Sequence, residues 1–122
     1  MRTVNEYLKV LGNIGLAARA RKITLGNELT CEAISAGKVR MVLMCESASS
    51  NTAKKLADYC GKNGVELCRI PVEPVALASA VGKSKPLMSV GITDDSLCIP
   101  VRNSIKALSN ATSSQQISES EV

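Results

Sequence analysis

A chain of 122 residues with 45% apolar residues is long enough to bury one hydrophobic core without disulfides or metals. It lacks Phe and Trp and has only Tyr7 and Tyr59, which argues against domains that stack bases on rows of aromatic rings, such as RNA-recognition motifs and oligonucleotide-binding barrels. The formal net charge is +4 although Glu119 and Glu121 lie in the final polar stretch. The rest of the chain is therefore more basic, which suits an anionic partner or a solvated lysine-rich surface.

The N-terminal third predicts a helix, a strand and a second helix. Apolar residues three and four apart indicate a first helix over Val4–Ala18, and Ile23–Leu25 is a short strand. The second helix starts in the stretch LGNELT, Leu25–Thr30, and runs to about Ala36, where Gly37 supplies a stop. The apolar residues of this helix predict that it buries Leu29, Ala33 and Ile34.

The middle of the chain predicts a central strand and a third helix. Met41–Cys45 is an unbroken apolar run, which is typical of a strand covered by helices on both faces. Either Ser49 or Ser50 can cap the helix that follows, and it ends near Gly61 or Gly64.

Three further elements and a basic loop complete the predicted domain. Val65–Ile70 is a strand, and Pro74–Val81 is a short helix with proline in its first turn. The basic loop Gly82–Pro86 leads into a strand over Leu87–Thr93, which contains a glycine. The last predicted helix, Ser96–Leu108, contains a proline.

Residues 109–122 are rich in Ser, Gln, Asn and Glu and have little to bury, so they are predicted to form a disordered tail beyond a single domain of residues 1–108. Helices alternate with strands along the whole domain. The predicted fold is therefore α/β, a three-layer α/β/α sandwich around a mixed sheet of about four strands.

The cysteine and histidine content bears on location and chemistry. Five cysteines, odd in number and mostly inside apolar runs, are expected as free thiols: Cys31, Cys45, Cys60, Cys68 and Cys98. With no CxxC pair and no histidine, we expect no metal, no cofactor and no catalytic general base. No apolar run approaches the ~20 residues of a membrane span and no secretion signal is present, so a cytoplasmic protein without membrane association is expected.

The turn Gly26-Asn27-Glu28 places an amide and a carboxylate together at a helix start. Asn27 fits a helix cap, and Glu28 fits a first-turn acid that complements the helix dipole. The same geometry suits nucleic acid, because backbone N–H groups there can hold a phosphate. In that case Glu28 accepts hydrogen bonds from base N–H donors, and Asn27 contacts a carbonyl or ring nitrogen.

The run from Gly15 to Leu67, which begins GLAARARKITLGNELT, closely resembles the L-seven-Ae/L-thirty-e superfamily of ribosomal kink-turn-binding proteins, above all its small bacterial ribosomal-protein-like members. The resemblance covers about Met1 to Leu108 and agrees with the predicted order of helices and strands. It implies a noncatalytic RNA-binding protein that recognises a kink-turn or similarly bent structured RNA, in the ribosome or another ribonucleoprotein.

In that family the helix-opening segment reads Gly, any residue, Asn, Glu, two residues and Lys, and it enters the widened groove of a kink-turn beside tandem sheared G-A pairs. Asn27 and Glu28 match the Asn and Glu. Gly26 lies one place after the family glycine, where Leu25 stands, and Cys31 replaces the lysine. The resemblance therefore implies weaker binding, or compensation elsewhere. Since residue 31 lies one turn after Asn27, Cys31→Lys is expected to tighten binding.

The family's second contact region is a loop in which a basic residue precedes proline and aliphatic residues pack against an extruded nucleotide. Lys85, Pro86, Leu87 and Met88 fit that pattern, and Lys83 adds charge. Considered without the resemblance, these residues would form a surface turn that leads into a core strand.

The densest basic cluster, Arg19, Arg21 and Lys22, is close in sequence to the turn and is expected to flank the RNA backbone, although cations at a helix end also complement its dipole. Two other functions are compatible with a fold of this kind. A ribose methyltransferase would need a catalytic domain and a cofactor loop, for which the sequence has neither room nor motif. A protein-interaction module of the same fold, with RNA affinity lost, is the alternative.

Overall fold

The computed structural model describes residues 2–121, with side chains described from Asn5 to Leu108. Within this range, five helices and four strands alternate: α1 (Arg2–Arg19), β1 (Ile23–Leu25), α2 (Asn27–Ser35), β2 (Met41–Cys45), α3 (Ser50–Asn63), β3 (Glu66–Ile70), α4 (Pro74–Ala80), β4 (Ser89–Ile92) and α5 (Asp95–Glu121). Every predicted helix and strand is present. Apart from the C-terminal end of α5, their boundaries agree with the predictions to within about two residues.

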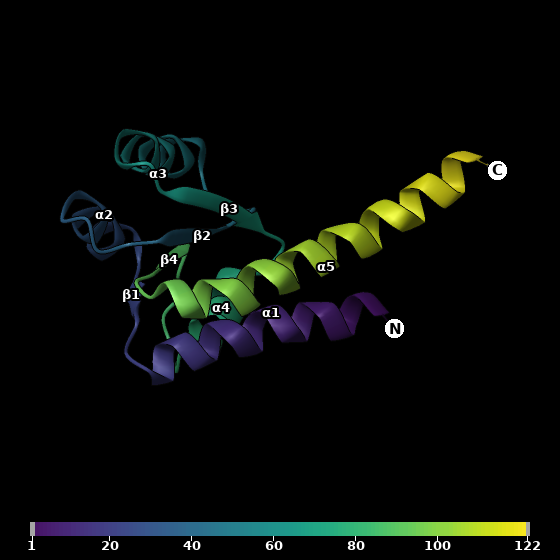
Figure 1. Cartoon of the computed structure of the whole chain (residues 1–122), viewed down its shortest axis with the longest axis horizontal. Coiled ribbons are helices and arrows are strands. Elements are labelled where there is room, and N and C mark those ends of the chain that lie inside the picture. The colour runs from purple at the N-terminus through teal and green to yellow at the C-terminus, as the bar shows by residue number, and fades with distance from the viewer. Residues whose placement is uncertain (1, 122) are drawn as a thin grey trace.

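The strands form one mixed sheet in the order β1-β4-β2-β3. Strand β4 is antiparallel to both of its neighbours, and β2 is parallel to β3. Helices α1, α4 and α5 cover one face of the sheet, and α2 and α3 cover the other (Figure 1). The predicted three-layer α/β/α sandwich around a mixed four-stranded sheet is confirmed.

The central strand β2 serves two hydrophobic cores at once, because successive side chains of a strand point to opposite faces. Met41, Leu43 and Cys45 belong to the core beneath α1, α4 and α5. Val42 and Met44 belong to the core beneath α2 and α3. All five side chains are buried, which explains why this segment is apolar without alternation.

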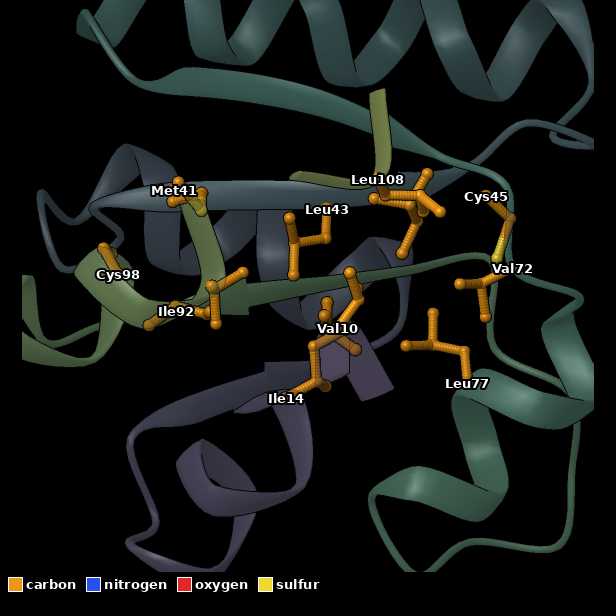
Figure 2. Packing of buried hydrophobic residues seen from close by; sticks show 13 residues of the cluster. Val10, Ile14, Met41, Leu43, Cys45, Val72, Leu77, Ile92, Cys98 and Leu108 are labelled. Carbon is orange, nitrogen blue, oxygen red and sulfur yellow. The ribbon is translucent and has the colours of Figure 1, made fainter. Parts of the chain in front are cut away.

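Figure 2 shows the larger core, in which side chains from α1, α4 and α5 meet those of the sheet. Val10 and Ile14 of α1 point toward Leu43 and Ile92, and Leu77 of α4 closes one side. Among the described residues, the buried members of this core carry no aromatic ring, and the partly buried Tyr7 packs against them.

Helix α3 has local signals at both ends. The Ser49 hydroxyl accepts a hydrogen bond from the Thr52 N–H at 3.2 Å, so Ser49 is the cap. Gly64 ends the helix in the left-handed region at φ 65°. These contacts decide between the alternatives that the sequence left open at each end.

Helix α5 differs most from its prediction. The predicted end was Leu108 with a disordered tail over 109–122, but the helix continues to Glu121 and extends past the body of the domain (Figure 1). Residues 109–121 contain neither proline nor glycine, so nothing in the backbone stops a helix that begins in the packed domain. The domain boundary at Leu108 stays a prediction, and Val122 lies outside the described residues. Among those residues, no helix combines the length and hydropathy needed to cross a membrane.

Gly91 allows α2 to lie close to the sheet. A Cβ at this position would be 2.6 Å from Thr24 Oγ1, and 3.2 Å from both Thr30 Cγ2 and Val39 Cγ1. The hydroxyls of Thr24 and Thr30 hydrogen-bond to each other at 2.9 Å, which joins β1 to α2 over this glycine. The glycine in β4 therefore serves packing between layers.

We expect Gly91→Ala to lower the free energy of unfolding by about 1–3 kcal/mol, because the added methyl group forces α2 away from β1 and β4. Urea denaturation measures this change. Gly12→Ala is the matched control, since a Cβ there meets nothing within 4 Å and alanine favours a helix. Equal stability of the two variants would mean that α2 has room to move.

Candidate nucleic-acid interface

The turn into α2 depends on Gly26. Its backbone has φ 89° and ψ 165°, a region that glycine adopts readily and other residues do not. Its N–H donates to the carbonyl oxygen of Ser89 in β4 at 2.9 Å, and its own carbonyl accepts from the Thr30 N–H at 3.1 Å. Gly26 is the N-cap and makes no side-chain cap bond, so the interpretation of Asn27 as the cap is wrong.

Asn27 is instead the first residue of α2, and its amide is held by the sheet. Its Oδ1 accepts a hydrogen bond from the Ser89 hydroxyl at 2.5 Å, and Ser89 is fully buried. This bond takes one lone pair of the amide oxygen, and among the residues that the structure describes no hydrogen bond engages the NH₂ group, which can donate to another molecule. Glu28 beside it is exposed. Within the described part of the chain, no hydrogen bond or ion pair engages the Glu28 carboxylate.

The second predicted contact region lies beside this turn. Leu87 Cδ2 is 3.9 Å from the position of a Cβ on Gly26, and Ser89, two residues further along, bonds to both Gly26 and Asn27. Segments about sixty residues apart in the sequence therefore share one surface at this edge of the sheet. The structure thus brings together the two regions that the family resemblance singled out.

Two hydrogen bonds of Leu87 hold the loop before β4 in place. The Leu87 N–H donates to the Pro74 carbonyl at the start of α4 at 3.1 Å, and the Cys45 thiol donates to the Leu87 carbonyl at 3.5 Å. Burial, reinforced by the Glu73 carboxylate, raises the pKa of Cys45 to about 11, so the sulfur keeps the proton that it donates. The loop is thereby tied to both α4 and β2.

The loop presents cations outward and apolar groups inward. Lys83, Lys85 and Pro86 are exposed, whereas Leu87 and Met88 are half-buried against the larger core. Positive charge therefore reaches solvent in the loop that leads to Leu87 and Ser89 beside the turn. The aliphatic side chains retain some surface on which a flat group can pack.

Cys31 does not belong to this surface. It is only 4% exposed and lies in the smaller core with Ile34, Leu56 and Cys60. Burial raises the pKa of its thiol. The prediction that residue 31 faces a ligand together with Asn27 is wrong, because this side of α2 is covered by α3.

The buried face of α2 also differs from the prediction. The buried residues are Thr30, Cys31 and Ile34, while Leu29 is 57% exposed and Ala33 is half-buried. The spacing of Cys31 and Ile34 was the available signal, since cysteine behaves as a small hydrophobe. The prediction counted Leu29 as buried because leucine is apolar, and it therefore chose the wrong face of the helix.

Arg21 and Lys22 are exposed but lie away from the turn. The Lys22 carbonyl accepts from the Thr93 N–H at 3.0 Å, at the opposite end of β1 from Gly26. Four residue-to-residue steps of ~3.3 Å each separate Lys22 from Gly26 by about 13 Å. That these cations flank the RNA backbone stays a prediction, and the strand between them and the turn means that they would contact a different part of the RNA from Asn27.

The architecture and the helix-opening turn correspond to one known family. The model of the ribosomal protein L7Ae/L30e/S12e/Gadd45 family matches residues 9–99. The chain belongs to this family. The L7Ae family is noncatalytic, in agreement with the prediction that the chain is not an enzyme. Among the described residues, no three metal-ligating side chains gather.

Two L7Ae-family relatives from bacteria carry the same name. The chain is 38% identical over 81 residues to the RNA-binding protein YlxQ of Bacillus subtilis. The aligned region covers 66% of this chain and 79% of that protein. It is 44% identical over 50 residues to the RNA-binding protein YlxQ of Enterococcus faecium, and this aligned region covers 41% of this chain and 48% of that protein.

Solved structures show the same architecture. A protein with unknown function from Bacillus halodurans superposes with a TM-score of 0.73 at 30% identity, covering 80% of this chain and 96% of that one. A 15.5 kD RNA-binding protein of Giardia lamblia has a TM-score of 0.70 at 23% identity, with coverage of 85% and 90%. The second similarity shows a shared fold alone.

Proposed function

We propose that this L7Ae-family protein is a noncatalytic RNA-binding protein that recognises a kink-turn or similarly bent structured RNA, in association with the ribosome or another ribonucleoprotein in the cytoplasm. The observation that carries this proposal is the Asn27 amide held by Ser89, next to the exposed Glu28 and the loop of Lys85. The names of the YlxQ relatives support RNA as the ligand. Free thiols at all five cysteines support a reducing compartment.

The polarity of the turn suggests how it reads RNA. Since Ser89 uses the oxygen of Asn27, the NH₂ group donates to a base acceptor. The Glu28 carboxylate can only accept, so it pairs with base N–H donors. Lys85 and Lys83 meet phosphates, which carry no sequence information but add affinity.

This division of roles requires bent RNA. In a regular A-form helix the major groove is deep and narrow, so short side chains at a helix start do not reach the base edges. A kink widens the groove and exposes the edges of tandem G-A pairs. A protein that inserts Asn27 and Glu28 should therefore distinguish bent RNA from a regular duplex by shape first, and RNAs of different sequence second.

The test is a titration of the protein with an RNA that contains tandem G-A pairs, and with a duplex of the same length in which Watson-Crick pairs replace them. We expect the kinked RNA to bind at least about tenfold more tightly, and the preference to persist at two salt concentrations, because base contacts depend little on salt. Equal binding to both RNAs would contradict the proposal.

Lys85→Ala should weaken binding to both RNAs by a similar factor and reduce the salt slope by about one unit, because one phosphate contact is lost. Fluorescence anisotropy at several salt concentrations measures the slope. Lys106→Ala, at an exposed position on α5, is the matched control and should change neither quantity. A change confined to the kinked RNA would identify Lys85 as a base reader.

A further inference from the structure

The outer edge of β1 carries unused main-chain groups. Strand β1 is an edge strand, and its flanking residues form hydrogen bonds on the other side: Gly26 with Ser89 of β4, and Lys22 with Thr93, which follows β4. In an antiparallel pair only every second residue hydrogen-bonds to the neighbouring strand, and the residues between them point their N–H and C=O groups to the opposite side. Ile23 and Leu25 therefore direct these groups away from β4. Within the described range, no hydrogen bond reaches those groups.

An open groove of about 590 Å³ runs beside this edge, between β1 and α2. The α2 wall is mainly apolar and includes Leu29, Ala33 and Ala36, of which Leu29 is 57% exposed. A leucine that exposed on the rim of a groove is available to an apolar side chain from another molecule. The edge and the groove together offer main-chain pairing and side-chain burial at one place.

Charge is unevenly distributed along the groove. Lys38 lines it, and Arg21 and Lys22 are exposed at the start of β1, away from the Asn27 turn. Glu32 also lines the groove and disfavours a phosphate backbone within it. The positive charges therefore lie at the Lys22 end of the groove, and the rest of the groove suits an uncharged stretch of polypeptide.

We propose that this edge and groove bind an extended segment of a partner protein, which adds to β1 as an antiparallel strand. Its main chain pairs with Ile23 and Leu25, and alternate apolar side chains enter the groove against Leu29 and Ala33. Acidic residues at its C-terminal end meet Lys22 and Lys38, because an antiparallel strand ends where β1 begins. A peptide fits better than RNA, since paired N–H and C=O groups are complementary to a main chain. This surface functions independently of RNA binding at Asn27.

The probe is a synthetic peptide of sequence TVTVTVED, acetylated at its N-terminus, titrated into the ¹⁵N-labelled protein without RNA. We expect amide chemical-shift changes centred on Ile23, Leu25, Leu29 and Ala33, and none at the loop of Lys85. The same peptide N-methylated at alternate amides should bind at least about tenfold more weakly, because it cannot pair with the edge.

Two variants test the charges and the groove. Lys22→Glu combined with Lys38→Glu should weaken the peptide about tenfold, whereas Lys54→Glu combined with Lys62→Glu on α3 should not. Ala33→Arg should block the groove, and retained amide dispersion would show that this variant is folded.

Several results would overturn the inference. They are no shift at Ile23 and Leu25, equal binding of the N-methylated peptide, or equal binding by the two charge variants. A uridine-rich oligonucleotide that shifts the same amides would assign the edge to RNA instead. Edge-specific shifts that depend on protein concentration alone would assign it to a second copy of this chain.

Discussion

Replacing Cys31 with lysine (Cys31→Lys) is expected to lower the free energy of unfolding by about 3 kcal/mol, because an ammonium group would be taken from water without a partner. Cys31 is 4% exposed and packs with Ile34 and Leu56 between α2 and α3. Lys55 is close enough that its charge partly offsets the rise in the Cys31 pKa that burial causes. A second ammonium there would also be repelled.

Urea denaturation measures this loss, with Cys31→Ala as control. Alanine keeps the site uncharged and removes only the sulfur, so it should cost about 1 kcal/mol. The difference between the two variants isolates the cost of the charge. A lysine variant that is as stable as the parent and binds the kinked RNA more tightly would instead place residue 31 on the RNA-facing side of α2.

Asn27→Ala is expected to reduce affinity for the kinked RNA by about 10- to 100-fold and to abolish most of the preference over the Watson-Crick duplex. In the proposed mode of binding the amide donates to a base only in the kinked RNA, so binding to the duplex should hardly change. Gly26 is the helix cap, so the loss of stability should come mainly from the broken bond to Ser89, about 1 kcal/mol. An unchanged RNA preference together with lower stability would make Asn27 a structural residue alone.

Ser89→Ala tests whether the bond to the sheet matters for RNA. Ser89 is fully buried, so its hydroxyl is not expected to touch RNA and should act through its hydrogen bond to Asn27. Loss of its hydroxyl should weaken the kinked RNA complex about fivefold, since the amide is no longer oriented. The double variant Asn27→Ala/Ser89→Ala should bind no worse than Asn27→Ala. Additive losses would show that Ser89 acts by another route.

The order and type of the helices and strands follow from local features of the sequence. The apolar run Met41–Cys45 is buried throughout because it forms the central strand. Ser49 and Gly64 supply the start and stop of α3 through contacts within a few residues. Such signals depend on neighbours in the chain, which is why they are readable without a structure. The Asn27-Glu28 pair was likewise recognisable from its own stretch.

Position in space depends on partners that are distant in the sequence. The rotation of α2 about its axis is decided by α3 and by the close approach at Gly91, so Cys31 is buried and Leu29 exposed. The separation of Lys22 from the turn follows from the pairing of β1 with β4. The sequence by itself determined the elements and the residue types at the turn, because both are local. Only the tertiary structure decided which side chains share a surface, because that depends on packing between layers and on strand register.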